Sequence, residues 1–136
     1  MTPQHRGSEL VMFPEVATVC AELALREPIF HRLELGATRA VFEAQTVEDF
    51  WEVGASGTVY GREQIWDILV ERYADPGHDD PWAASDFFCR ELGPGTYLLT
   101  YLLDQAGRIT RRATVWRRGA QTWQIVYHHG TVVSEA

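Results

Sequence analysis

The residues best suited to acid–base chemistry are Glu52, in an aromatic stretch, and two adjacent histidines, His128 and His129. An imidazole titrates near neutral pH, and a carboxylate buried beside aromatic rings has a raised pKa, so either group can act as a general base. Adjacent strand residues point to opposite faces, so the two histidines cannot hold one metal ion together, and at most one faces a pocket. The alternative for all three residues is a structural or surface role.

A second group joins a cation to aromatic side chains. Arg112 lies on a strand-like, aromatic stretch, where burial of a guanidinium is costly unless it is paired or faces water. A pocket that receives an anionic or enolate-like oxygen would explain it, with Arg112 as charge partner and Tyr101 as hydroxyl donor. The alternative is an internal salt bridge between Arg112 and Glu52. The other expected pocket residues are Tyr97, Thr114, Trp116, Trp123, Tyr127 and His129.

Apolar spacing predicts which elements position these residues. The expected helices cover residues 15–27, 38–45 and 61–73, with a short helical turn near 29–33. The expected strands cover residues 47–53, 58–60, 82–92, 96–103, 108–118 and 121–133. The composition of residues 74–81 is that of a loop. Helices followed by an antiparallel meander indicate an α+β domain over residues 13–133, behind a flexible tail at 1–12.

Turn length predicts which strand residues share a face. A two-residue turn at Gly119-Ala120 would pair Trp116 with Trp123, Arg112 with Tyr127 and Thr110 with His129. A two-residue turn at Ala106-Gly107 would add Tyr97 and Tyr101 to the same face. His128 would then lie on the other face, and the sequence leaves open which face is concave.

Both sheet faces carry large apolar groups, so neither is an ordinary solvent face. The chain's own helices can cover one face, and the other predicts a homodimer joined through the sheet. The alternative is that the helices wrap far enough to cover parts of both faces.

Composition excludes several function classes. The chain has 136 residues, enough for one domain, and a net charge of −7, which disfavours nucleic acid as a partner. All 12 basic residues are arginine, which removes Schiff-base and lysine-base chemistry. His78, Asp79 and Asp80 have metal-ligand side chains but lie together on one predicted loop, so we expect no metal site. No phosphate-binding glycine loop occurs, and we expect no cofactor.

The cysteines point to a reducing compartment. Cys20 and Cys89 lie far apart and form no CxxC pair, and the sequence shows no signal peptide and no long apolar run. We therefore expect buried, reduced thiols, a cytoplasmic protein and no membrane partner.

Three stretches carry a resemblance to a known family. They are DFWEVGASGTVYGREQI (49–65), GPGTYLLTY (93–101) and RRATVWRRGAQTWQIVYHHGT (111–131). They look like a bacterial branch of unknown function in the nuclear transport factor 2-like superfamily, which resembles SnoaL-like polyketide cyclases and ketosteroid isomerases in fold. The resemblance covers about residues 15–131. It implies a cone-shaped, cystatin-like α+β fold, with N-terminal helices packed in a strongly curved, mainly antiparallel sheet.

The resemblance also marks individual positions. Glu52 and Ser56 on the hairpin, Tyr101 and Arg112 match recurrent residues of that branch, and His128 matches its histidine. Two positions depart from the pattern: Thr114 stands where serine is usual, and His129 where glutamine is usual.

The resulting functional expectation is a small-molecule-binding protein. Its pocket would lie inside the cone and take a largely apolar ligand with a polar or anionic end. One alternative is a cofactor-free isomerase, cyclase or dehydratase, in which Glu52 or His128 is the base and Arg112 with Tyr101 are oxyanion partners. A further alternative is a protein–protein interaction module, because this fold hosts many unrelated activities.

Overall fold

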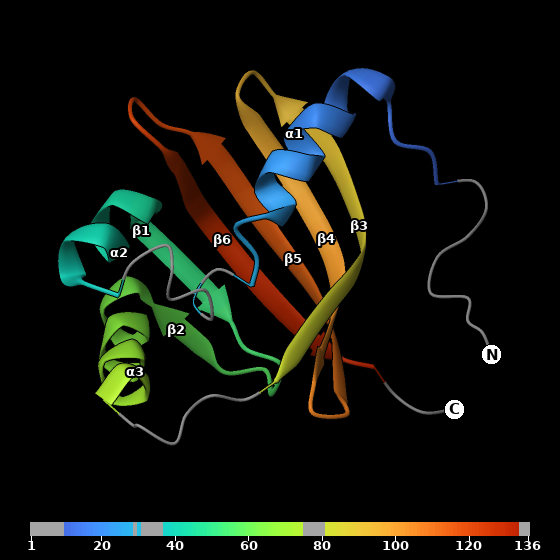
Figure 1. Cartoon of the computed structure of the whole chain (residues 1–136). Helices are drawn as coiled ribbons and strands as arrows, with labels where there is room; N and C mark the ends of the chain where they lie inside the picture. Colours follow the sequence, from blue (N-terminus) through green and yellow to red (C-terminus); the bar gives the residue numbers. More distant parts are fainter. Residues whose placement is uncertain (1–9, 29, 31–36, 75–80, 134–136) are drawn as a thin grey trace.

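The computed structural model describes residues 10–28, 30, 37–74 and 81–133. Within these residues, three helices and six strands follow one another along the chain, in the order that Figure 1 labels. The helices are α1 (Pro14–Ala24), α2 (Arg39–Gln45) and α3 (Arg62–Ala74). The strands are β1 (Thr46–Val53), β2 (Val59–Gly61), β3 (Trp82–Gly93), β4 (Thr96–Gln105), β5 (Arg108–Arg118) and β6 (Trp123–Val132). Most of the expected tail, most of the helical turn near 29–33 and the loop segment with His78, Asp79 and Asp80 lie outside the described residues.

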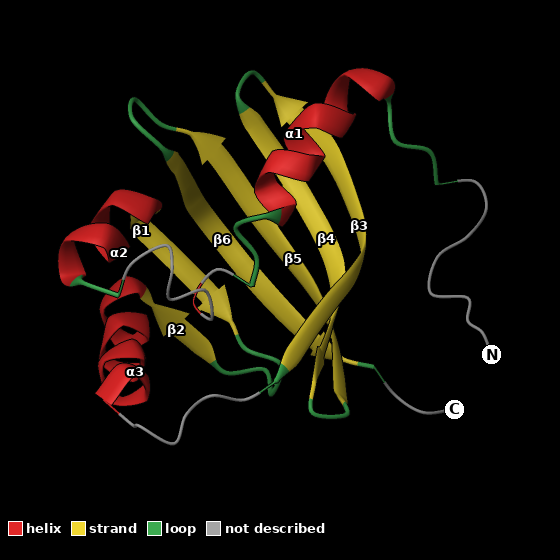
Figure 2. Cartoon of the chain, in the orientation of Figure 1, coloured by secondary structure: helices red, strands yellow, loops and turns green. Residues whose placement is uncertain are grey.

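The six strands form one sheet in the order β2-β1-β6-β5-β4-β3. All neighbours are antiparallel except β1 and β6, which are parallel. Helix α1 contacts β3 and β4, whereas α2 and α3 contact β1 (Figure 2). The expected α+β architecture of helices against a mainly antiparallel sheet is therefore confirmed. Among the described residues, no helix has the length and apolar character needed to cross a bilayer.

Local sequence explains where the helices begin. Pro14 occupies the first turn of α1, where its fixed φ suits the helix and its missing N–H is not needed. Thr38 caps α2, with its hydroxyl accepting from the N–H of Val41 at 3.3 Å. Arg62 then ties α3 back to β1 by donating to the hydroxyl of Thr46 at 2.9 Å.

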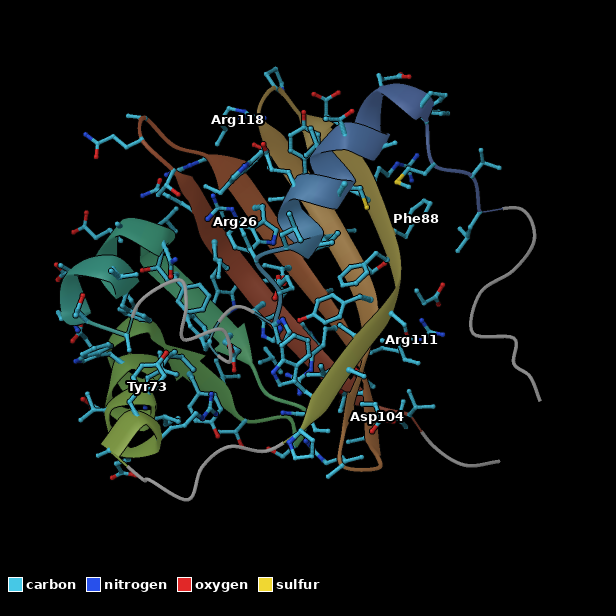
Figure 3. All side chains as sticks on the ribbon, viewed as in Figure 1. Arg26, Tyr73, Phe88, Asp104, Arg111 and Arg118 are labelled. Carbon is cyan, nitrogen blue, oxygen red and sulfur yellow. The ribbon has the colours of Figure 1, made fainter. Side chains whose placement is uncertain are left out.

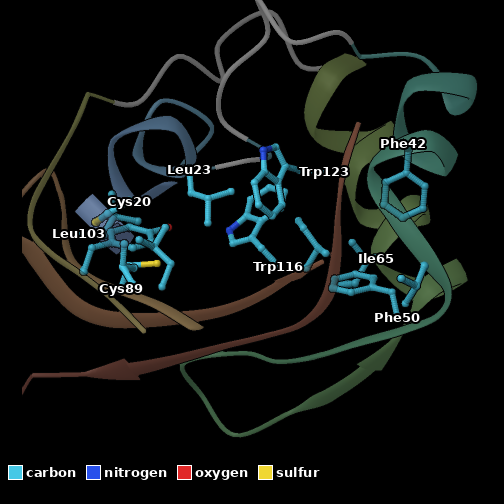
Figure 4. Close-up of a cluster of buried hydrophobic side chains, with 14 of the residues drawn as sticks. Cys20, Leu23, Phe42, Phe50, Ile65, Cys89, Leu103, Trp116 and Trp123 are labelled. Atoms are coloured by element: carbon cyan, nitrogen blue, oxygen red, sulfur yellow. The ribbon is translucent and has the colours of Figure 1, made fainter. Parts of the chain in front are cut away.

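The core lies between the helices and the sheet face that they cover. Figure 4 shows Leu23 of α1 beside Trp116 and Trp123, with the strands bending around this cluster. Phe50, Leu69 and Tyr101 are also almost completely buried. We call this helix-covered side of the sheet the inner face, and the opposite side the outer face.

The register between β4 and β5 agrees with expectation. Gln105 pairs with Arg108, so Ala106-Gly107 is a two-residue turn, and both of its residues have a positive φ, as a type I′ hairpin requires. Tyr97 pairs with Trp116, and Tyr101 pairs with Arg112 on the inner face.

The expected register between β5 and β6 is wrong at two points. Arg118 pairs with Trp123, so the turn is longer than Gly119-Ala120, and Trp116 pairs with Ile125 instead of Trp123. An irregularity between Val115 and Trp116 then shifts the pairing. At this point β6 has one residue more than β5. Beyond it, each side chain of β6 therefore points to the face opposite to the one expected.

The shift decides where the histidines lie. Arg112 pairs with Gly130, not Tyr127, and Thr110 pairs with Val132, not His129. His128, which the expected register placed opposite the Arg112 face, instead joins it as the partner of Thr114. Tyr127 and His129 therefore lie on the outer face.

Candidate functional site

A largely buried carboxylate–imidazole pair lies on the inner face. Glu52 of β1 and His128 of β6 are partners in the parallel pairing, with His128 Nδ1 3.1 Å from Glu52 Oε1. Their side chains are 15% and 9% exposed, respectively. In the tautomer whose Nδ1 carries the proton, Nδ1 donates a hydrogen bond to the carboxylate. Nε2 is then an acceptor, which can take a proton from another molecule.

Arg112 lies half-buried on the same face. Its Nε donates to the hydroxyl of Thr110 at 2.9 Å, and its Nη2 donates to Oε1 of Gln105 at 3.4 Å. Burial lowers the pKa of Arg112, although the nearby Tyr101 and Glu52 act in the opposite direction. Within the described part of the chain, no ion pair joins Arg112 to Glu52, which bonds to His128 instead. The alternative of an internal salt bridge is thus wrong.

A glycine makes room for this guanidinium. A Cβ placed on Gly130 would come within 2.9 Å of Arg112 Nη1 and 3.2 Å of its Cζ. The side chain of Arg112 therefore lies across the backbone of β6 at Gly130, where any other residue would push it away.

Glu27 is a site residue that sequence reasoning missed. Its carboxylate is fully buried and accepts two hydrogen bonds, from the Tyr101 hydroxyl at 2.9 Å and from Trp116 Nε1 at 3.1 Å. It follows α1 in a stretch that contains no recognisable motif. Burial, and then the negative charge of Glu27, raise the pKa of Tyr101 well above its ordinary value. The hydroxyl proton of Tyr101 thus points to Glu27, which leaves the oxygen free to accept but not to donate.

Thr114 is the one buried side chain, among the described residues, with a polar atom that has no hydrogen-bond partner. The residue is 0% exposed and lies on β5 between Leu99 of β4 and His128 of β6. A buried hydroxyl without a partner costs about 1–3 kcal/mol, so this atom marks a place where a water or a ligand oxygen would be bound.

The other expected pocket residues are divided among several places. Trp116 and Trp123 are buried on the inner face, where the Nε1 of Trp123 donates to Glu22 at 2.7 Å. Tyr97 packs edge-on against Trp123 at a ring distance of 5.7 Å. Ser56 is exposed on the β1–β2 hairpin, 3.3 Å from the hydroxyl of Thr58, and does not join this group.

Tyr127 and His129 form a separate pair on the outer face. The Tyr127 hydroxyl is 2.7 Å from His129 Nδ1, and the Tyr127 ring stacks obliquely on Trp51 at 4.6 Å.

Of the residues that the sequence singled out, the inner face brings together Glu52, His128, Arg112, Tyr101 and Thr114. In the described residues, no group of three or more His, Cys, Asp or Glu side chains could hold a metal ion.

Comparison with known proteins identifies the fold but no activity. No family model and no curated protein sequence matches the chain. Solved structures do match, among them a protein of unknown function from the DUF3225 family of Pectobacterium atrosepticum. It is 22% identical, with a TM-score of 0.64, over 91% of this chain and all of the other.

Two further bacterial structures match this chain, and their descriptions name the fold. An uncharacterised protein with a cystatin-like fold from Caulobacter vibrioides is 16% identical, with a TM-score of 0.64, over 86% of this chain and 89% of that one. An NTF-2 like protein of unknown function from Silicibacter pomeroyi is 17% identical, with a TM-score of 0.59, over 90% of this chain and all of that one. The expected nuclear transport factor 2-like, cystatin-like fold is confirmed.

Proposed function

We propose that this chain, which has the nuclear transport factor 2-like fold, binds a small, largely apolar molecule at the inner face of its sheet. The anionic or polar end of the ligand contacts Arg112 and Thr114. The observation that carries the proposal is the buried Thr114 hydroxyl, which has no hydrogen-bond partner. Arg112, a half-buried cation, lies two residues away on the same face of β5.

The charge of Arg112 supports a ligand with an anionic end. Its two hydrogen bonds go to the neutral acceptors Thr110 and Gln105, and burial already lowers its pKa. A partly desolvated guanidinium gains most from a carboxylate, to which it can donate charge-assisted hydrogen bonds. Trp116, buried on the same face, supplies an apolar wall for the rest of the ligand.

The first test uses deoxycholate, a rigid apolar carboxylate, as the probe. We expect it to raise the melting temperature and quench tryptophan fluorescence in the wild type, and to do so weakly in Arg112→Gln. Thr114→Val should also bind the probe more weakly. Since the substitution removes an unpartnered hydroxyl, the free Thr114→Val protein should be as stable as the wild type or more stable.

The matched control is Thr96→Val, which changes a half-buried threonine of β4 on the outer face. This variant should bind deoxycholate as the wild type does. A Thr114→Val protein that is clearly destabilised, or an Arg112→Gln protein that binds deoxycholate normally, would contradict the proposal.

A second candidate is favoured by the Glu52–His128 pair. A buried imidazole held by a carboxylate is suited to proton transfer, and Arg112 next to it could stabilise the developing negative charge of an enolate. The chain would then be a cofactor-independent isomerase, cyclase or dehydratase. Turnover of a steroid enone or polyketide-like substrate that is lost in Glu52→Gln and His128→Ala, with nearly unchanged melting temperatures, would establish this function. A fall in stability with no turnover to lose would assign both residues a structural role.

A further inference from the structure

A hollow of about 460 Å³ lies on the outer face of the sheet, on the side opposite the proposed inner site. Its size falls within the range of about 300–1,000 Å³ that is typical of small-molecule sites. Figure 3 shows two of its lining residues, Phe88 and Arg111, projecting beyond β3 and away from α1.

The hollow follows from side-chain size along one row of the sheet. Phe88, Thr100, Ala113 and His129 are successive partners across β3, β4, β5 and β6. The two small side chains lie in the middle of the row and the two large ringed ones at its ends. Because side chains of a strand stand roughly perpendicular to the sheet, this order leaves a floor with a wall on either side.

One wall is rigid and aromatic. The Tyr127 ring packs against Trp51 at 4.6 Å, and its hydroxyl bonds to His129 Nδ1 at 2.7 Å. With Phe88 opposite, these rings border a shallow floor that suits a flat aromatic group.

The rim carries an ion pair and an imidazole. Arg111 lies 36% exposed at the hollow, with its Nη1 3.4 Å from Asp86 Oδ2, and Asp86 and His129 also line it. Asp86 has a positive φ of 59° within an irregular stretch of β3. Such a bulge redirects a side chain, and bulges are frequent beside binding sites.

We propose that this outer hollow is a second ligand site, which takes a small aromatic carboxylate. The ring lies on Thr100 and Ala113 between Phe88 and Tyr127, and the carboxylate contacts Arg111 and His129. Tyr101 and Arg112 of the proposed inner site also line the hollow, but Ala113 and Thr114 are neighbours on β5 whose side chains point to opposite faces, so the two sites can be told apart by substitution.

The test uses 1-naphthoate as the probe, with binding followed by calorimetry. Ala113→Leu puts a larger side chain into the hollow and leaves the core on the inner face unchanged. Arg111→Gln removes the positive charge at the rim. We expect each variant to weaken binding at least tenfold, and Thr96→Val, on the outer face of β4 but outside the hollow, to leave it unchanged. The neutral methyl ester should bind the wild type more weakly than the acid does, and this preference should be lost in Arg111→Gln.

Three results would overturn the proposal. Weaker 1-naphthoate binding in Thr114→Val but not in Ala113→Leu would place the probe at the inner site. Equal affinity of the wild type for the acid and the ester would show that Arg111 does not bind the carboxylate. An Ala113→Leu protein that binds the probe normally but sediments at a lower mass would identify the hollow as a contact between copies of the chain. If Ala113→Leu fails to fold, Arg111→Gln and the ester decide the matter alone.

Discussion

Glu27 shows how much a single buried residue can control. A fully buried carboxylate is tolerated only when hydrogen bonds replace its lost water, and here Tyr101 and Trp116 provide two of them. These bonds also fix what Tyr101 can offer a ligand, since its proton is committed to Glu27. Tyr101 therefore acts at the inner face as an acceptor, in place of the donor that the sequence suggested.

Removing the Tyr101 hydroxyl tests this arrangement. Tyr101→Phe removes the buried hydrogen bond that this hydroxyl donates to Glu27, and we expect the free energy of unfolding to fall by about 1–3 kcal/mol. Tyr97→Phe is the control, because the Tyr97 hydroxyl makes only a long, exposed contact of 3.5 Å with Glu91. Urea denaturation measures both. Equal losses in the two variants would contradict the role of Glu27.

The cysteines give a prediction about pH at the same scale. Cys20 and Cys89 are free and buried, as expected from the sequence, and burial raises the pKa of Cys89 to about 12 and also raises that of Cys20. A raised pKa lowers the thiolate fraction, and only the thiolate attacks a disulfide. Neither thiol should react with an aromatic disulfide reagent at pH 8 in the native protein, and both should react in denaturant. Fast reaction of native protein would contradict the burial of these thiols.

At the scale of elements, β6 determines the chemistry of the inner face. Its irregular pairing near Val115 and Trp116 brings His128, in place of Tyr127, alongside Arg112 and Glu52. Gly130 then leaves room for the guanidinium of Arg112. The inner site thus depends on the pairing of β5 with β6 as well as on the residues themselves.

Gly130→Ala tests the contribution of β6. The new Cβ would meet the end of a flexible side chain, so the fold should persist while the guanidinium is displaced. We expect deoxycholate affinity to fall roughly tenfold, because hydrogen bonds to charged groups contribute about 1.5–3 kcal/mol. Gly93→Ala, where a Cβ would meet nothing within 4 Å, should leave affinity unchanged. A Gly130→Ala protein with wild-type affinity would show that Arg112 is not held in this way.

The whole molecule leaves the outer face of a six-stranded sheet without a helix over it among the described residues. Leu98, Leu102 and Val115 share this face and are only partly buried. Partly exposed apolar side chains on an uncovered sheet face favour association. We propose a homodimer joined through these three side chains, none of which lines the outer hollow, so that the hollow stays open beside the interface.

Sedimentation measures the oligomeric state directly. The wild type should sediment at twice the chain mass of 15.5 kDa, and Leu98→Glu should shift it to the monomer, because a dimer would bury the new charge. Thr18→Glu on the exposed side of α1 is the control and should remain dimeric. A wild type that is monomeric until another protein is added would favour the interaction-module alternative.

The sequence by itself determined the elements and most of the inner face. Alternation along β4 and β5 is a local property, and the Ala106-Gly107 turn fixes their register, so Tyr101, Arg112 and Thr114 could be placed together from sequence. The helices were predicted within a few residues because Pro14, Thr38 and apolar spacing signal them locally.

Only the tertiary structure decided which histidine joins Arg112 and what holds Tyr101. The length of the β5–β6 turn and the irregularity beyond it depend on how β6 packs between β5 and β1, and one extra residue exchanges the faces of His128 and His129. Glu27 lies 74 positions before Tyr101 and 89 before Trp116. Contacts over such separations arise from the folding of the helices onto the sheet, and no spacing within a local segment encodes them.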